Sequence, residues 1–310
     1  MNEEGKNQFT HLKIHTQYSI CEGAIKIANL KEFCKKNKIK AIGLSDTRNL
    51  CGALEFSENI SKVGTQPIIG TQINFKYKDQ IGILPLIANN FEGYKSVINL
   101  SSKSYLENDS MTEPHCSLKE LLKIKEGVTL LSGSLNGLIG NLFLNNLTTE
   151  IDEIFELLKD IFKSNFYIEI QRHNNVGERL FEEFLLDKSH NFNIPLIATH
   201  EVFYLDKDMH EAHDALICIG EKTYINEKNR KKYSNQHYLK TTDEMIKIFS
   251  DLPEALENNF NFPLRCNYKP SPSPPLLPNI KKNSGISVDE ELSNLALVGL
   301  GEKFKEFIFK

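Results

Sequence analysis

The chain has 310 residues, 40% of them hydrophobic, so it is long enough for one large domain or for a domain followed by part of another. Its 37 basic and 41 acidic side chains give a formal net charge of −4, which excludes a global electrostatic attraction to nucleic acid and leaves only a local one. The acidic start MNEEGKNQ lacks the apolar stretch of a signal peptide, and no apolar run approaches the roughly 20 residues of a membrane helix. We therefore expect a cytoplasmic protein without membrane association.

Short apolar strands alternate with amphipathic helices over the first 200 residues. The expected strands are Phe9–His15, Ala41–Ser45, Pro67–Phe75, Ile81–Ala88, Val128–Ser132, Phe166–Gln171 and Pro195–Thr199. Helices are expected around residues 25–34 and at Asn49–Val63, Phe91–Tyr105, Ser117–Ile124, Glu150–Phe162 and Gly177–Asn191. A polar turn, KYKDQ, predicts a hairpin between the third and fourth strands. Such alternation is typical of a mainly parallel sheet, and seven or so βα units favour a closed or distorted α/β barrel over an open sheet.

After Thr199 the pattern changes to helices alone, and no further strand is expected. These helices are Asp208–Ile219, Thr242–Phe249 and Pro253–Phe262. Residues Tyr268–Asn279 contain five prolines and predict an extended linker, because proline lacks the amide donor and fixes φ. The motif SVDEE then begins an amphipathic helix over Ser287–Lys310. We expect a barrel domain over residues 1–268, a linker over 269–286 and the truncated start of a further domain over 287–310.

The six cysteines are scattered without a CxxC pair, which argues against a zinc knuckle and against a disulfide scaffold. We expect them to be small buried hydrophobic residues, because free cysteine is usually interior. They are Cys21, Cys34, Cys51, Cys116, Cys218 and Cys266.

Histidine and aspartate residues lie in or directly after several of the expected strands. They are His11, His15, Asp46, His173 and His200. Because the carboxyl ends of barrel strands meet at one mouth, this layout is that of a polynuclear metal site that activates water against a phosphate ester. From the residues alone, the alternative that each histidine is a hydrogen-bonded structural residue is favoured.

Several segments resemble the PHP (polymerase and histidinol phosphatase) domain at the N-terminus of bacterial replicative DNA polymerases, the alpha subunits of DNA polymerase III. They are FTHLKIHTQYSICEGAIKI, IKAIGLSDTRNLCGALEF, QPIIGTQI, FYIEIQRHN, PLIATHEVFYL and HEAHDALICIG, and the likeness runs from about Phe9 to Arg265. SVDEELSNLALVGL resembles the start of the polymerase core. The resemblance implies a PHP-type distorted (βα)7 barrel followed by a short helical start of that core, in a polymerase whose palm aspartates and magnesium lie beyond Lys310.

The resemblance also implies that the metal motifs of the family are largely lost in this sequence. Lys13 and His15 stand at the HxH motif, and Glu22 at the carboxylate of the DGA motif. Asp46 keeps the first position of the DHG motif, whereas Thr47 replaces its histidine.

The remaining motifs are changed in the same way. Gln72 stands where a glutamate follows IIG, and a family cysteine in the LSG segment falls on Ser134. In the final NDxH motif Glu201 keeps a carboxylate, whereas Phe203 replaces the histidine.

The resemblance leaves few possible metal ligands, namely His15, Glu22, His173 and Glu201. They cannot furnish the three protein ligands that each of three ions needs. An ammonium at Lys13 about 4 Å from a dication would add roughly 8 kcal/mol of repulsion at an effective dielectric near 20. We therefore expect no catalytic residue and no bound metal in this chain, and Lys13 paired with Glu22, Glu201 or Asp46.

Two functions from different classes follow from the resemblance. The favoured one is a scaffold that supports the polymerase core in cis and docks a proofreading exonuclease subunit, with DNA bound through the full-length protein. The alternative is a zinc- or manganese-dependent phosphoesterase, acting as a 3′–5′ exonuclease or a pyrophosphatase.

Four other features are interpreted as structural. His11 is expected to be a hydrogen-bonding residue of the first strand, and His210 and His213 to pack on one helix face. The glycine-rich GSLNGLIG lacks the Lys-Ser/Thr ending of a P-loop and predicts a turn between a strand and a helix. The basic run EKNRKKY predicts a solvated loop, which is favoured over the alternative of a DNA contact.

Overall fold

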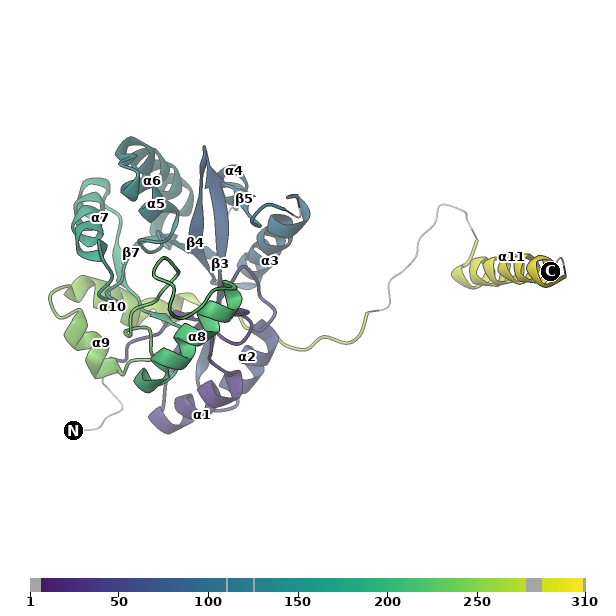
Figure 1. The fold of residues 1–310 in the computed structure, drawn as a ribbon, viewed down its shortest axis with the longest axis horizontal. Coiled ribbons are helices and arrows are strands. Elements are labelled where there is room, and N and C mark those ends of the chain that lie inside the picture. The colour runs from purple at the N-terminus through teal and green to yellow at the C-terminus, as the bar shows by residue number, and fades with distance from the viewer. Residues whose placement is uncertain (1–6, 110, 125, 277–285, 309–310) are drawn as a thin grey trace. The chain divides into compact units, whose positions relative to one another are not determined.

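The structure is a computed structural model that describes residues 7–109, 111–124, 126–276 and 286–308. The chain divides into two compact units, residues 1–271 and 272–310, drawn in Figure 1. In these ranges, none of the helices has both the length and the apolar character that crossing a bilayer requires.

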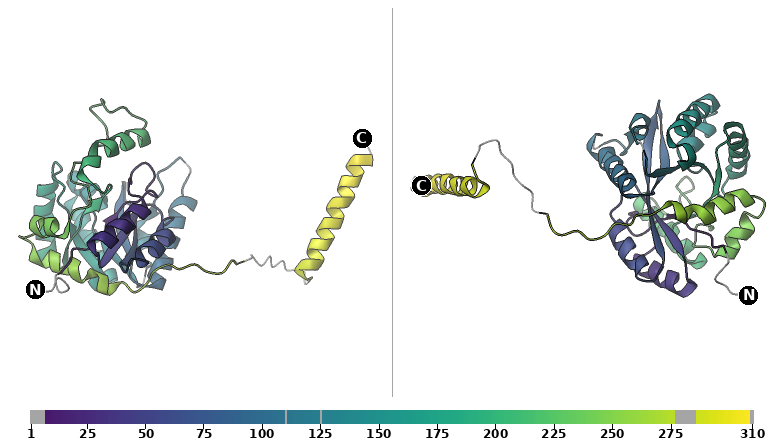
Figure 2. Two further views of the ribbon diagram at one scale, coloured as in Figure 1. Left: turned by 90° about the horizontal axis from the view of Figure 1, so that it is seen from below. Right: turned by 180° about the vertical axis from the view of Figure 1, so that it is seen from behind.

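Unit 1 is built on a curled sheet of nine strands with helices around it (Figures 1 and 2). The strands are β1 (Lys13–Ile14), β2 (Ala41–Thr47), β3 (Gln66–Tyr77), β4 (Gln80–Ala88), β5 (Cys116–Ser117), β6 (Val128–Leu131), β7 (Phe166–Ile170), β8 (Leu196–Ala198) and β9 (Glu201–Val202). Their order is β8-β7-β6-β4-β3-β2-β1-β9, with β5 paired to β3. The two ends of this path, β8 and β9, follow each other directly in the chain, so they must lie close together and the sheet must curl into a half-barrel. This confirms the expected distorted α/β barrel.

The sheet is mainly parallel, with one inserted antiparallel strand. β4 runs antiparallel to both β3 and β6, and the turn between β3 and β4 is the expected hairpin. The expectation of no strand after Thr199 is wrong, since β9 pairs with β1. The first strand is also much shorter than Phe9–His15, and it pairs in parallel on both sides.

The helices follow the predicted alternation with small differences at their ends, and one of them is additional. They are α1 (Ile27–Asn37), α2 (Ala53–Ser61), α3 (Phe91–Leu106), α4 (Leu118–Leu121), α5 (Leu138–Leu144), α6 (Thr148–Phe162), α7 (Glu178–Phe192), α8 (His210–Gly220), α9 (Thr242–Ile248) and α10 (Pro253–Asn261). The additional helix is α5, at the end of the expected GSLNGLIG turn. α6 shows why they form: Ile151, Phe155 and Leu158 recur on one buried face at helical spacing. A capping box of Thr241 and Glu244 begins α9.

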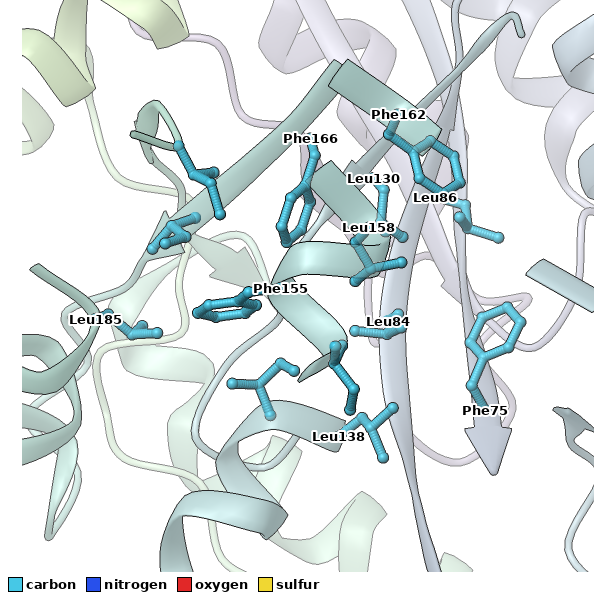
Figure 3. Close-up of a cluster of buried hydrophobic side chains, with 14 of the residues drawn as sticks. Phe75, Leu84, Leu86, Leu130, Leu138, Phe155, Leu158, Phe162, Phe166 and Leu185 are labelled. Atoms are coloured by element: carbon cyan, nitrogen blue, oxygen red, sulfur yellow. The ribbon is translucent and has the colours of Figure 1, made fainter. Parts of the chain in front are cut away.

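Two apolar layers hold the sheet. The outer layer packs strands against helices, and includes Phe75, Leu84, Phe155 and Phe166 (Figure 3). Each such side chain stabilises the fold by about 1.5–3 kcal/mol relative to exposure. The inner layer draws residues from most strands of the sheet, so it fills the inside of the curl: Leu12, Ala41, Ile68, Ile87, Leu131, Tyr167, Ile197, Phe262 and Cys266.

Unit 2 contains one described helix, α11 (Val288–Ile308), in the segment where an amphipathic helix is expected. Its Leu292, Leu295 and Phe304 side chains are exposed. Part of the predicted linker, residues 277–285, lies outside the described residues.

Candidate functional site

The candidate site lies at the carboxyl ends of the strands, beside the short strand β1. Lys13 pairs in register with Glu201 of β9, and Ile14 with Val202. On β7, Phe166, Ile168 and Ile170 join the outer apolar layer. Glu169, which alternates with them, therefore points into the barrel, where it meets Lys13.

Lys13 is the centre of a buried ion network, and its side chain is only 2% exposed. Its Nζ lies 3.2 Å from Glu169 Oε1 and 3.6 Å from Glu201 Oε1. Burial alone would lower the pKa of Lys13, but the charges of Glu169 and Glu201 outweigh it and raise the pKa above its ordinary value. The ammonium is therefore held charged between two carboxylates.

His15 extends this network on the other side of Glu201. Its Nε2 lies 3.0 Å from Glu201 Oε1, and the Gln72 amide donates to the same oxygen over 2.6 Å. Burial would raise the pKa of Glu201, but Lys13 and His15 hold it well below its usual range. We call Lys13, His15, Gln72, Glu169 and Glu201 the mouth network.

Thr47 connects the mouth network to a second group of polar side chains. Its hydroxyl lies 3.2 Å from His15 Nδ1 and donates to Glu22 Oε2 over 2.5 Å. Glu22 Oε1 accepts from Lys231 Nζ at 2.9 Å and from the Tyr233 hydroxyl at 2.8 Å. Burial would raise the pKa of Glu22, but the charges of His15 and Lys231 outweigh it and lower this pKa to about 2.

The loop that carries Lys231 and Tyr233 follows α8, which projects with it from one end of unit 1 (Figure 2). Arg230, in the same loop, forms two hydrogen bonds of 2.6 Å with Asp214, and its side chain is 2% exposed. The prediction of a solvated loop at EKNRKKY is correct for most of the run, since Glu227, Lys228, Asn229, Lys231 and Lys232 are exposed, but the run is also attached to the fold. Three side chains of this run fasten it to the fold at Glu22 and Asp214.

Among the described residues, three of the expected site residues form no hydrogen bond with the side chains of the mouth network. Asp46 accepts hydrogen bonds from the hydroxyls of Thr16 at 2.8 Å and Ser19 at 2.7 Å. Phe203 stacks on the His15 ring, with ring centroids 4.3 Å apart.

His173 is the third of these residues. Its backbone amide donates to Glu178 Oε2, and its Nε2 accepts from the Glu201 amide at 3.2 Å. Its ring is stacked between those of His200, at 4.6 Å, and His237, at 4.0 Å. Burial lowers the pKa of His200 and of His237 well below the usual value, so these two outer rings are neutral at pH 7.

The histidines interpreted as structural have structural contacts. His11 Nε2 lies 2.8 Å from the carbonyl oxygen of Lys240, and burial lowers the pKa of His11 to about 4. His210 and His213 reach backbone carbonyls of Tyr233 and Glu22. The cysteine prediction is correct for four residues and wrong for Cys21 and Cys51, whose side chains are exposed in turns.

The mouth opens into a cavity of about 480 Å³. Its lining includes Lys13, His15, Gln72 and Glu201, together with Glu22 and Ser134. Both His15 nitrogens and Glu201 Oε1 are already engaged with protein groups, and a cation fixed by the chain stands beside them. Throughout the described ranges, no group of three His, Cys, Asp or Glu side chains is arranged to hold a metal ion. The donor set therefore does not fit a metal centre.

Sequence reasoning missed Glu169 as the nearer partner of Lys13, and it offered Glu22 and Asp46 as partners that Lys13 does not contact. The missed signal was the alternation in FYIEIQR, where a carboxylate stands at an inward position of a buried strand. It also missed Tyr233 and Lys231, for which the sequence carries no comparable periodicity.

Comparison with known proteins agrees with this architecture. Residues 11–173 match the family model described as PHP domain. DNA polymerase III subunit alpha of Caulobacter vibrioides is 33% identical over 313 residues, which cover 97% of this chain and 27% of that protein. The Rickettsia bellii subunit is 34% identical over 304 residues, covering 97% and 26%, and the Borreliella burgdorferi subunit is 33% identical over 319 residues, covering 98% and 28%. The chain thus spans about a quarter of the length of these curated relatives.

Among solved structures, one described as a metal-dependent phosphoesterase from Bifidobacterium adolescentis has a TM-score of 0.42 and 12% identity, and the match covers 78% of this chain and 96% of that one. The family match, which extends over more than half of the sequence, settles the class: the chain belongs to the PHP domain family. Within it, the chain is homologous to the N-terminal region of DNA polymerase III alpha subunits, which places it in the context of DNA replication.

Proposed function

We propose that this chain is the PHP domain of a replicative DNA polymerase in which an internal ion network has taken the place of a hydrolytic metal centre. It serves as a scaffold for the polymerase core in cis and as a docking surface for a proofreading exonuclease subunit. The full-length protein, located in the cytoplasm, contacts DNA and carries the magnesium-dependent synthesis. The relatives named above support the polymerase context.

The position of Lys13 is the observation that supports the loss of hydrolytic activity. A metal-dependent phosphoesterase needs carboxylates and imidazoles whose lone pairs are free for an ion and an open position for water. Here the carboxylates of Glu169 and Glu201 are already neutralised by an ammonium 3.2 and 3.6 Å away. A dication about 4 Å from that ammonium would meet roughly 8 kcal/mol of repulsion at an effective dielectric near 20.

Metal content tests this proposal directly. The 310-residue chain is incubated with zinc and manganese, desalted, and measured by inductively coupled plasma mass spectrometry. In parallel, hydrolysis of DNA 3′ ends, of a nitrophenyl phosphate ester and of diphosphate is assayed. We expect no stoichiometric metal and no hydrolysis. Two or more ions per chain, with an activity that a chelator and His15→Ala both abolish, would establish the phosphoesterase alternative instead.

The scaffold role has its own test. The chain and the exonuclease subunit of the same organism are mixed and run together on size-exclusion chromatography with light scattering. Co-elution as a complex supports the docking function, and separate elution at concentrations well above those of a replisome contradicts it.

A further inference from the structure

The end of the barrel opposite the mouth carries a concentration of basic side chains. α1, α2 and α6 each precede a parallel strand, β2, β3 and β7, so the carboxyl ends of these helices lie at the amino ends of the strands. Lysines stand in the last turn or at the C-cap of each helix: Lys35, Lys36 and Lys38 on α1, Lys62 on α2, and Lys159 and Lys163 on α6.

Residues 263–269 cross this end of the barrel and join these lysines into one surface. The Gln66 amide at the start of β3 donates to the carbonyl oxygens of Pro263 and Cys266. Arg265 donates to Asn165, directly before β7. Lys269 donates to Ser61, at the end of α2. We call the six helix-end lysines together with Arg265 and Lys269 the basic face.

The charge of the basic face is not neutralised by the protein. All of its side chains are exposed, and in the part of the chain that the structure describes none of them forms an ion pair. The exposed acidic side chains within about one turn of these lysines, Glu32, Glu58, Glu156 and Asp160, are fewer. Residues 26–40 alone contain six lysines and one glutamate, in a chain whose net charge is −4.

Helix dipoles do not account for this pattern by themselves. Cations in the last turn of a helix are favourable, which explains Lys35, Lys36 and Lys159. Arg265 ends a separate 3-10 helix, and Lys269 lies in no helix, yet both extend the same surface.

A cavity of about 490 Å³ lies on the basic face. Lys159, Lys163 and Arg265 line it together with Asn193 and Asn258, and Asp160 is the acidic residue among its lining. Three cations against one carboxylate, with an amide donor beside them, match the chemistry of a phosphate group.

We propose that the basic face is a second, sequence-independent nucleic-acid contact, which binds the phosphate backbone of duplex DNA and receives one phosphate in the cavity beside Lys163. The cations are spread along the ends of three βα units instead of converging on one point, so they match a row of phosphates better than a single carboxylate. The contact is local, in keeping with the negative net charge of the chain. It is independent of the metal content of the mouth.

The test measures binding of the 310-residue chain to a fluorescein-labelled duplex of mixed sequence by fluorescence anisotropy at several salt concentrations. The variant Lys62→Gln/Lys159→Gln/Lys163→Gln removes three cations of the basic face. Its matched control, Lys207→Gln/Lys222→Gln/Lys228→Gln, removes three exposed lysines elsewhere. Circular dichroism and thermal melts verify that both variants are folded.

For three phosphate contacts the wild-type affinity should fall about 40-fold between about 50 and about 200 mM salt. The basic-face variant should bind more weakly and lose about 0.9 from the salt slope for each contact removed, whereas the control should bind like the wild type. Equal binding by the wild type and the basic-face variant, or an equal loss in the control, would overturn the proposal. The proposal would also be overturned if the wild type bound polyglutamate but not DNA. That result would identify the basic face as a site for acidic protein segments.

Discussion

Replacing Lys13 with methionine keeps most of the volume of the side chain and removes the charge between Glu169 and Glu201. Glu169 is 0% exposed and Glu201 is 13% exposed, so the Glu169 carboxylate cannot regain its solvation in the folded protein and the Glu201 carboxylate can regain it only in part. Removing one partner of a buried ion pair costs about 3–5 kcal/mol, because an uncompensated charge stays buried. For a large domain, about 2–4 °C per kcal/mol makes this a drop of roughly 6–20 °C in Tm.

The assay is urea and thermal unfolding followed by circular dichroism. A matched control is Lys78→Met, which removes a lysine whose pairs with Glu150 and Glu153 are open to solvent, and we expect little change there. The double variant Lys13→Met/Glu169→Gln should recover part of the lost stability, because the carboxylate that loses its partner is then neutral. If Lys13→Met is no more destabilising than Lys78→Met, or if the double variant is simply additive, the ion network does not stabilise the mouth.

Three further outcomes are expected. His11 has a pKa of about 4 in the folded protein, against 6.5 in the unfolded chain, so it stays neutral in the fold while the unfolded chain binds a proton below pH 6.5. The free energy of unfolding should therefore fall by about 1.4 kcal/mol per pH unit for each such imidazole. Urea midpoints that stay flat between about pH 7 and pH 5 would contradict this. A thiol reagent should modify Cys21 and Cys51 quickly in the native protein and the other four cysteines only after unfolding, and slow modification of all six would be the contrary result. Glu22→Gln should loosen the loop after α8 and speed tryptic cleavage there, whereas Glu227→Gln, an exposed change in the same loop, should leave the cleavage rate unaltered.

Most of the fold could be predicted from the sequence because apolar periodicity reports burial. The strand–helix alternation and the β3–β4 hairpin are confirmed within a few residues at most ends. β9 could not be found in this way. It has two residues, and it exists because the curled sheet presents the free edge of β1 at that point. The glycines of GSLNGLIG predict a turn between a strand and a helix, and they conceal that the helix α5 begins already at Leu138.

The candidate site was predictable in part. Lys13 and Glu201 come together as expected, because both follow from strand order and from the resemblance to the PHP family. The alternation on β7 indicates that Glu169 points inward, but Glu169 stands at none of the motif positions of the family. Tyr233 reaches Glu22 across 211 residues of sequence, and no local pattern encodes such a contact.

The way in which β1 is held has a consequence for how the protein folds during synthesis. His15 meets Glu201 across 186 residues of sequence, and the Thr10 amide meets the Asn259 side chain across 249. At about 5–20 residues per second, the ribosome supplies these partners roughly 10–40 s and 12–50 s after the N-terminal segment has been made. During that interval β1 lacks one neighbouring strand, and the charge of Lys13 lacks one of its carboxylates. The first part of the domain to be synthesised is therefore among the last to be completed, and a nascent chain that stops before residue 259 leaves this segment open to chaperones or to pairing with another chain.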